Sequence, residues 1–407
     1  MKEILNGVVA PMGFTANGIN AGIRKGKTKN DLTLIKSSVL ANVAGVFTSN
    51  LVKAAPIYVC MKHLENGKGQ AIVANSGNAN TCNADGIYIA EETCKIVAKN
   101  LNVKEEDVFV ASTGVIGMPL SLEPFKTGIP TCSLNLGNTI EHSKSAIEGI
   151  MTTDTKPKSV AVEFEINGKT CKMGAMTKGS GMIAPDLATM LCFITTDACV
   201  SSKVLDYALK NVILDTFNML SVDGDTSTND TVLIFANGLA GNDEIISTTS
   251  NEYSEFYQAL KYVTTSLVKM MAKDGEGATK LLVSHVTGAK TVLDARIVAK
   301  KVIQSSLLKA AIFGADANWG RVLCAIGYSK ANVDITKVKV TFVSKAGSVL
   351  VCENGAGVEF SEEIAKKVLL EDEITIEIEL NDGKEEASGY GCDLTYDYVK
   401  INGDYRS

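Results

Sequence analysis

Short apolar runs alternate with amphipathic segments along most of the chain. Residues 71–77 and 107–117 have the apolar content of buried strands and end in glycine turns, whereas residues 87–101 repeat apolar positions at the helical period. After residue 190 the pattern predicts strands at 192–196, 230–238 and 280–288, separated by helices at 202–220 and 252–275. The last third adds paired strands at 337–347 and 348–355, a helix at 362–370 and an alternating strand at 373–383. We therefore expect an α/β (α+β) fold of layered sheets flanked by helices.

Composition describes an ordinary globular protein. Of its 407 residues, 45% are hydrophobic and 21% are charged, which is enough to bury a large core. The net charge of -6 argues against nucleic-acid partners, and no apolar run approaches the roughly 20 residues that span a bilayer. The ten cysteines are scattered without a CxxC pair, so we expect reduced, mostly buried thiols and a cytoplasmic protein.

Several common catalytic chemistries lack their residues. The chain has three histidines, and none accompanies a glycine-rich turn that carries Ser or Cys. His285 stands alone in an apparent strand and is interpreted as a core residue, and no metal site is expected. The DGEGATK run at 274–280 resembles the end of a P-loop but lacks its full spacing. Nucleotide and metal chemistry are therefore not favoured.

The segment KGSGMIAPDLATML, residues 178–191, places a glycine-rich loop and an Ala-Thr pair directly before an apolar strand. A threonine that begins a chain can use its own α-amine, with a pKa of about 7.7 to 8.0, as the base for its hydroxyl. Thr189 would acquire that amine if the Ala188–Thr189 bond were cut by attack of its own hydroxyl on the preceding carbonyl. From pattern alone, a tight loop before an ordinary strand remains the alternative.

This segment resembles the processing site of the ornithine acetyltransferase or glutamate N-acetyltransferase family, the bifunctional acetyltransferases of arginine biosynthesis. The resemblance covers nearly the whole chain, and its further motifs follow the family's order: residues 7–23, 44–56, 74–82, 111–117, 150–155, 274–280, 314–322 and 401–407. Within them, the SGNAN loop at 76–80 and the lone Trp319 are interpreted as structural elements. One departure is Asp186, a charge placed two residues before Ala188.

The resemblance implies self-cleavage and a set of site residues. An α chain of 1–188 and a β chain of 189–407 would remain together, as a heterotetramer of two α and two β chains. Thr189 would be the nucleophile, and Thr113 and Gly114 would form the oxyanion hole. The implied substrate contacts are Thr152, with Thr153 as the alternative, together with Lys178, Thr189, Glu276, Asn402 and Ser407.

The resemblance also implies a reaction, in which acetyl passes from N-acetylornithine to glutamate through an ester on Thr189. Lys178 suits a substrate α-carboxylate, and an acid suits the ornithine ammonium. No cofactor is expected, and acetyl-CoA as a second acetyl donor is left open. Two alternatives also stay open: an amidase or aminopeptidase of the same self-processing architecture, and a small-molecule binding protein without catalysis.

Overall fold

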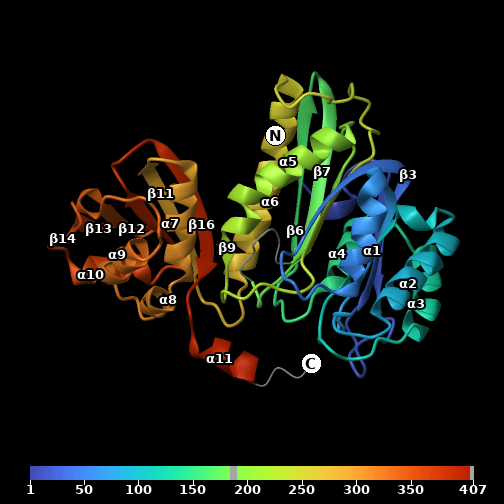
Figure 1. Ribbon diagram of the computed structural model, residues 1–407, viewed down its shortest axis with the longest axis horizontal. Helices are drawn as coiled ribbons and strands as arrows, with labels where there is room; N and C mark the ends of the chain where they lie inside the picture. The colour runs from blue at the N-terminus through green and yellow to red at the C-terminus, as the bar shows by residue number, and fades with distance from the viewer. Residues whose placement is uncertain (184–189, 404–407) are drawn as a thin grey trace.

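The computed structural model describes residues 1–183 and 190–403 (Figure 1). Within them, nine strands form a first sheet with the order β1-β6-β7-β8-β10-β3-β4-β5, and β2 pairs with β3. Neighbours are antiparallel except for the parallel pairs β8–β10 and β4–β5. The strands are β1 (Lys2–Ile4), β2 (Phe14–Ile19), β3 (Leu32–Phe47), β4 (Lys68–Asn75), β5 (Val108–Ser112), β6 (Lys158–Ile166), β7 (Lys169–Lys178), β8 (Leu191–Thr196) and β10 (Thr231–Ala236).

Helices cover both faces of this sheet. Figure 1 shows α1 to α4 on the outer side and α5 and α6 on the side that faces the rest of the molecule. These helices are α1 (Ala55–His63), α2 (Gly86–Leu101), α3 (Glu123–Leu134), α4 (Ile140–Ile150), α5 (Ser202–Asp215) and α6 (Asn251–Lys273). Because both faces are covered, the strands between them are apolar on both sides.

A second sheet is built from the later part of the chain, with the order β14-β13-β12-β15-β11-β16-β9. Its strands are β9 (Leu220–Ser221), β11 (Leu281–Ala289), β12 (Lys339–Ser344), β13 (Gly347–Glu353), β14 (Ala356–Gly357), β15 (Glu373–Glu379) and β16 (Glu385–Cys392). The remaining helices are α7 (Val292–Gln304), α8 (Ser306–Phe313), α9 (Trp319–Gly327), α10 (Glu362–Leu369) and α11 (Tyr396–Gly403). Helix α7 packs on β11 and β16, and α11 lies apart from the sheet (Figure 1).

Two apolar clusters hold these layers together. One lies between the first sheet and α1 to α4, and the other runs from the opposite face of that sheet through α5 and α6 into the second sheet. Strand β8 contributes to both, because Leu191 and Phe193 face the first cluster while Cys192 and Ile194 face the second. The continuous apolar run after residue 190 is thus explained by burial on both faces.

The α/β (α+β) prediction with layered sheets is confirmed. The predicted strands at 192–196 and 230–238 correspond to β8 and β10, and the predicted hairpin after residue 337 corresponds to β12 and β13. The helix predicted at 252–275 corresponds to α6, which ends at Lys273 and has Asp274 as its C-terminal cap residue. All ten cysteines are free and most are buried, as expected.

The expected division into 1–188 and 189–407 stays a prediction. It would fall between β7 and β8, which are paired neighbours in the first sheet with Lys178 opposite Leu191. The two expected chains would therefore share one sheet, while the second sheet begins only at β9. Over the described residues, no helix combines the length and apolar character required to cross a bilayer.

Candidate active site

A small cavity collects most of the side chains that the sequence singled out. Its volume is about 130 Å³, and its walls come from the loops after α4, β5, β7 and α6, the loop before β10, and α11. The described lining residues are Thr113, Gly114, Ile116, Thr152, Thr153, Lys178, Gly181, Met182, Ser227, Thr228, Asn229, Glu276 and Asn402. Segments that lie far apart in the sequence thus meet at one point.

The turn at Thr113 and Gly114 follows directly after β5 and is held by the neighbouring loop. Gly114 has φ +133°, and a Cβ there would lie 2.3 Å from the carbonyl carbon of Gly77 and 2.5 Å from the nitrogen of Asn78. Only glycine fits such a backbone approach. The SGNAN loop therefore supports this turn, in agreement with its structural interpretation.

Lys178 ends β7 and points its ammonium group toward the same turn. Its side chain is 9% exposed, and Nζ donates to the Thr113 hydroxyl at 3.4 Å. Burial lowers the pKa of Lys178, and the negative charge of Asp154 opposes this effect. A buried cation at the wall of a cavity is a suitable site for a substrate carboxylate.

Behind Lys178 lies a buried charge network that sequence analysis did not find. The ammonium of Lys158 donates to Asp154 at 2.6 Å and also to Asp274, and these side chains are almost fully buried. Asp154 also accepts from the backbone N–H of Gly179 at 2.8 Å. Burial would raise the pKa of Asp154, but the charges of Lys178 and Lys158 and these hydrogen bonds lower it to about 2. The network fixes the backbone next to Lys178.

Glu276 and Asn402 both line the cavity and contact each other. The amide of Asn402 donates to Glu276 Oε2 at 2.8 Å, and the backbone N–H of Glu276 donates to the carbonyl of Ser180 at 2.8 Å. A Cβ on Gly181 would lie 2.3 Å from the Glu276 carboxylate, so glycine leaves the room that this acid needs. The carboxylate is a suitable partner for a substrate ammonium.

Thr152 and Thr153 both line the cavity. The hydroxyl of Thr153 is 2.7 Å from that of Ser180, whereas the backbone N–H of Thr152 donates to Asp154 at 3.0 Å. The Thr152 hydroxyl has no hydrogen-bond partner within the part of the chain that is described. This arrangement leaves the Thr152 hydroxyl available for a ligand.

Asn229 is a lining residue that sequence analysis missed. Its amide donates to the carbonyls of Ala79 at 2.6 Å and Ser112 at 2.7 Å, and its Oδ1 accepts from the hydroxyls of Thr81 and Thr228. It therefore joins the loop before β10 to the end of β5. The polar run at 223–230, between two apolar strands, was the available signal.

Three of the expected site residues, Ala188, Thr189 and Ser407, lie outside the described residues. Met182, shortly before the segment that contains the first two, lines the cavity. A Cβ on Gly179 would lie 2.8 Å from the Ile183 side chain and 3.5 Å from Met190. Met190 also lines a small hollow that shares Thr113 and Lys178 with the cavity.

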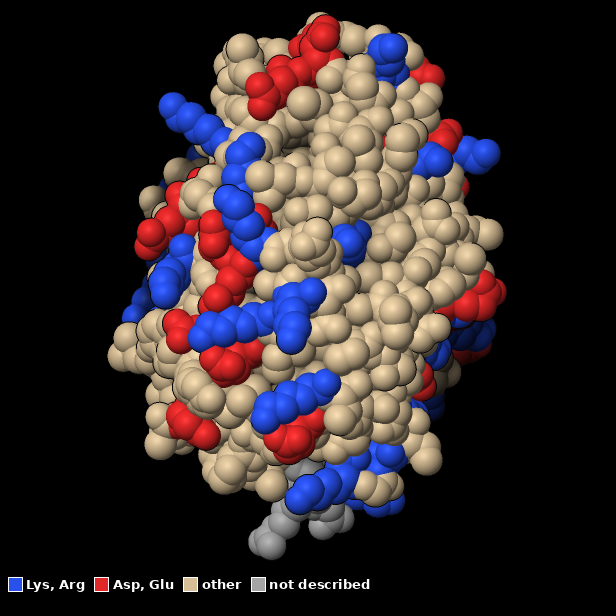
Figure 2. All heavy atoms as spheres, turned by 90° about the vertical axis from the view of Figure 1, so that its right-hand side faces the viewer, with Lys and Arg blue, Asp and Glu red and all other residues tan. Residues whose placement is uncertain are grey.

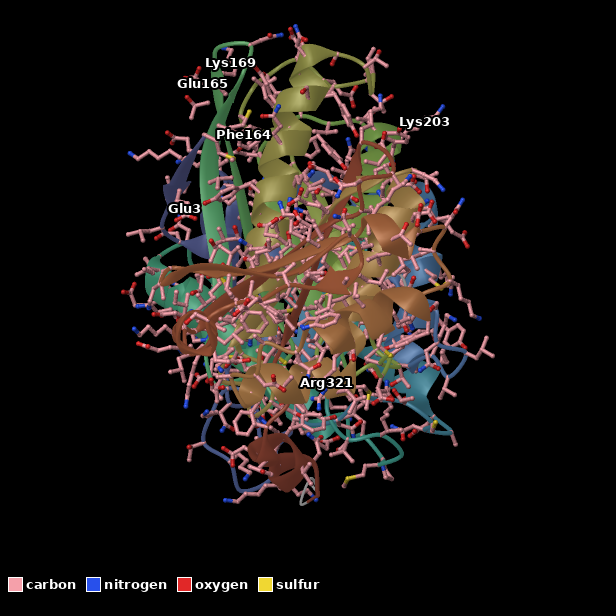
Figure 3. The ribbon with its side chains drawn as sticks, turned by 90° about the vertical axis from the view of Figure 1, so that its left-hand side faces the viewer. Glu3, Phe164, Glu165, Lys169, Lys203 and Arg321 are labelled. Carbon is pink, nitrogen blue, oxygen red and sulfur yellow. The ribbon has the colours of Figure 1, made fainter. Side chains whose placement is uncertain are left out.

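Two larger hollows are lined by none of the expected site residues that the structure describes. One of about 410 Å³ lies between β1, β6 and α6, where Figure 3 places Phe164 and Glu165 far from α11. Another, of about 590 Å³, lies behind the Asp274 loop and α11 and is lined by lysines and aspartates. Of the residues that the structure describes, no group of three or more His, Cys, Asp or Glu is placed to hold a metal ion. His285 lies half-buried in β11, with Nδ1 3.0 Å from the Ser388 hydroxyl, outside the cavity lining.

The sequence is similar to known proteins over almost its whole length. The model of the ArgJ family matches residues 15–407. The chain belongs to the ArgJ family. The arginine biosynthesis bifunctional protein ArgJ of Caldanaerobacter subterraneus is 51% identical over 407 residues, covering 100% of both chains. ArgJ 1 of Clostridium acetobutylicum is 50% identical and covers 97% of this chain and 96% of its own.

A solved ArgJ structure shares part of the fold. The crystal structure of the arginine biosynthesis bifunctional protein ArgJ from Bacillus halodurans matches with a TM-score of 0.50 and 43% identity, over 52% of this chain and 98% of that chain. The family resemblance and the prediction of an enzyme of arginine biosynthesis are thereby confirmed.

Proposed function

We propose that this ArgJ family member transfers the acetyl group of N-acetylornithine to glutamate through an ester on Thr189. The observation that carries the proposal is the convergence of Thr113, Gly114, Lys178 and Glu276 on one cavity, beside both ends of the segment that contains Thr189. The cavity offers a cation for an α-carboxylate and an acid for the ornithine ammonium.

The nucleophile is made by self-cleavage. The Thr189 hydroxyl oxygen attacks the Ala188 carbonyl carbon, the peptide C–N bond breaks, and the nitrogen becomes the α-amine that takes up the hydroxyl proton. Water then hydrolyses the ester, which leaves a carboxylate on Ala188 and restores the hydroxyl.

Acetyl transfer follows in two half-reactions. The α-amine of Thr189 accepts the hydroxyl proton as the oxygen attacks the acetyl carbonyl, and the Thr113–Gly114 turn stabilises the oxyanion. The C–N bond of N-acetylornithine breaks, and ornithine leaves with that proton. The amine of glutamate then attacks the ester and releases N-acetylglutamate, which frees the hydroxyl. Thr152 and Asn402 contact the substrate in this scheme, as does Ser407 from outside the described residues.

We also propose a cytoplasmic protein of two α and two β chains that needs no cofactor. Figure 2 shows basic and acidic side chains interspersed on the face formed by α2 and α3, which fits small-molecule substrates better than nucleic acid. Relatives are named bifunctional, and acetyl-CoA as a second acetyl donor stays an open part of this proposal.

Two measurements test the proposal. Intact mass spectrometry under denaturing conditions should give two fragments, one of which begins Thr-Met-Leu-Cys in N-terminal sequencing. The cleaved protein, incubated with N-acetylornithine and glutamate, should release ornithine and N-acetylglutamate in equal amounts. Free acetate in place of N-acetylglutamate would favour the amidase alternative, and a single uncleaved chain from folded protein would favour the binding protein.

A further inference from the structure

The carboxylate of Asp223 holds the backbone that leads into the cleavage segment. One of its oxygens accepts from the N–H of Met182 at 2.6 Å, and the other accepts from the N–H of Ile183 at 2.7 Å. The hydroxyl of Tyr398 in α11 donates to the same carboxylate at 3.3 Å. Asp223 does not line the cavity, so none of the roles described above includes it.

The backbone at this point needs such a partner. Met182 has φ +55°, a left-handed conformation that is unfavourable for a residue with a side chain and persists only where neighbours hold it. Around it, the N–H of Val222 donates to the carbonyl of Ile183 at 2.7 Å, and Lys309 donates to the carbonyl of Val222. Asp223 thus belongs to a strand-like contact that fixes the last described residues before the cleavage site.

The far end of the segment is fixed as well. The carbonyl of Met190 accepts from the N–H of Thr231 at 2.7 Å, and the carbonyl of Leu191 accepts from the Thr177 hydroxyl at 3.1 Å. Ile183 and Met190 are both buried against Gly179. Ile183 and Met190, the described residues on either side of the segment, are therefore two anchored points that lie close together.

We propose that Asp223 is a positioning residue for the cleavage of the Ala188–Thr189 bond. This inference rests on the proposed function, because it assumes that cleavage occurs there. The carboxylate takes no proton and forms no bond to the reacting atoms. It holds residues 182 and 183, so that the Thr189 hydroxyl can reach the Ala188 carbonyl in the orientation that attack requires. A displacement of about 1 Å in such an arrangement costs about a hundredfold in rate.

The experiment follows cleavage of newly made chains. Four chains are synthesised by in vitro translation with a short radioactive pulse: wild type, Asp223→Asn, Asp223→Glu and Asp225→Asn. Loss of the full-length band is followed on denaturing gels. Asparagine keeps the shape of the side chain, but its Nδ2 cannot accept a hydrogen bond, so one of the two backbone N–H groups loses its acceptor. We therefore expect cleavage about tenfold to a hundredfold slower than in wild type. Asp223→Glu keeps the carboxylate and should recover part of the rate.

Asp225→Asn is the matched control, because Asp225 is an exposed neighbour on the same loop, and it should cleave at the wild-type rate. A second control separates positioning from folding: Asp223→Asn is compared with its parent in a Thr189→Ala background, where neither chain is cut. Both should melt well above the assay temperature.

The outcomes are distinct. Wild-type cleavage rates in Asp223→Asn would overturn the inference, as would equal slowing by Asn and Glu or a melting transition that falls to the assay temperature. Failure of the wild type itself to yield a fragment that begins at Thr189 would instead overturn the proposed function.

Discussion

Replacement of Gly114 by alanine tests the oxyanion turn directly. The new Cβ would lie 2.3 Å from the carbonyl carbon of Gly77 and 2.5 Å from the nitrogen of Asn78. Ordinary contact for a Cβ begins near 3.4 Å, so one of the two backbones must move by about 1 Å. These are main-chain atoms that cannot rotate away as a side chain would. The turn, which carries the proposed oxyanion donors, therefore shifts relative to the SGNAN loop.

The expected loss follows from that displacement. A misplacement of about 1 Å costs about a hundredfold in rate, and loss of one oxyanion donor costs about a hundredfold to a thousandfold in kcat. We expect Gly114→Ala to cleave itself slowly and, once cleaved, to transfer acetyl with a kcat lower by about a hundredfold. The assay measures ornithine released from N-acetylornithine in the presence of saturating glutamate, per mole of cleaved enzyme.

Gly117 provides the matched control on the same turn. It also has a positive φ, of +76°, but no atom lies within 4 Å of a Cβ placed there. Gly117→Ala therefore carries the backbone strain without the collision, and it should keep kcat near the wild-type value. Wild-type kcat in Gly114→Ala, or an equal loss in both variants, would refute the assignment of this turn to the oxyanion.

Three further changes probe the charged side chains. The ratio kcat/KM for N-acetylornithine should rise with pH as the Thr189 amine loses its proton, near 7.7 to 8.0. It should fall again at alkaline pH, because burial lowers the pKa of Lys178 below the usual 10.5 and the ammonium loses its proton. Lys178→Arg should abolish only this alkaline fall, and an alkaline fall that persists in the variant would contradict the role of this lysine. Asp154→Asn should lower the free energy of unfolding by about 3 to 5 kcal/mol in urea titrations at pH 7, whereas Asp206→Asn, in an exposed pair of the same i,i+4 spacing, should change it by about 0.5 kcal/mol or less. Because the pKa of Asp154 in the folded protein is lowered to about 2, its contribution to the free energy of unfolding should be complete above pH 3.8 and lost as pH falls toward 2. A stability difference between wild type and Asp154→Asn that does not change over this pH range would contradict the ion network. Glu276→Gln should raise KM for N-acetylornithine about tenfold and change KM for glutamate little, while an equal rise for both would place the acid elsewhere.

The order of apolar and polar residues predicted those helices and strands whose buried positions repeat at the helical or the strand period. Strand β15 alternates buried and partly exposed positions, as its sequence suggested, and α2 follows the helical repeat of residues 87–101. The long strand β3 and the pair β6–β7 were not predicted. In β3 the register with β4 shifts between Lys36 and Ala41, so the sequence shows no continuous alternation through that region.

The candidate site was predicted mainly through the family resemblance, and the structure adds the residues that support it. Lys178 and Glu276 could be named from motifs, but Lys158 and Asp223 could not, because each acts through partners distant in the chain. A lysine within an apparent strand carries no sign that an aspartate 116 positions away will neutralise it. Such pairings arise only when the layers assemble.

Strands β7 and β8 stand on either side of the proposed cut and are bonded to each other in the middle of the first sheet. Neither product could therefore form that sheet alone, and the two anchors of the cleavage segment exist only once the sheet is complete. Under the proposed mechanism, a chain must reach its native state before it can make its own nucleophile. The new amino terminus would therefore be present only on chains that have folded, since misfolded copies would remain uncut and inactive.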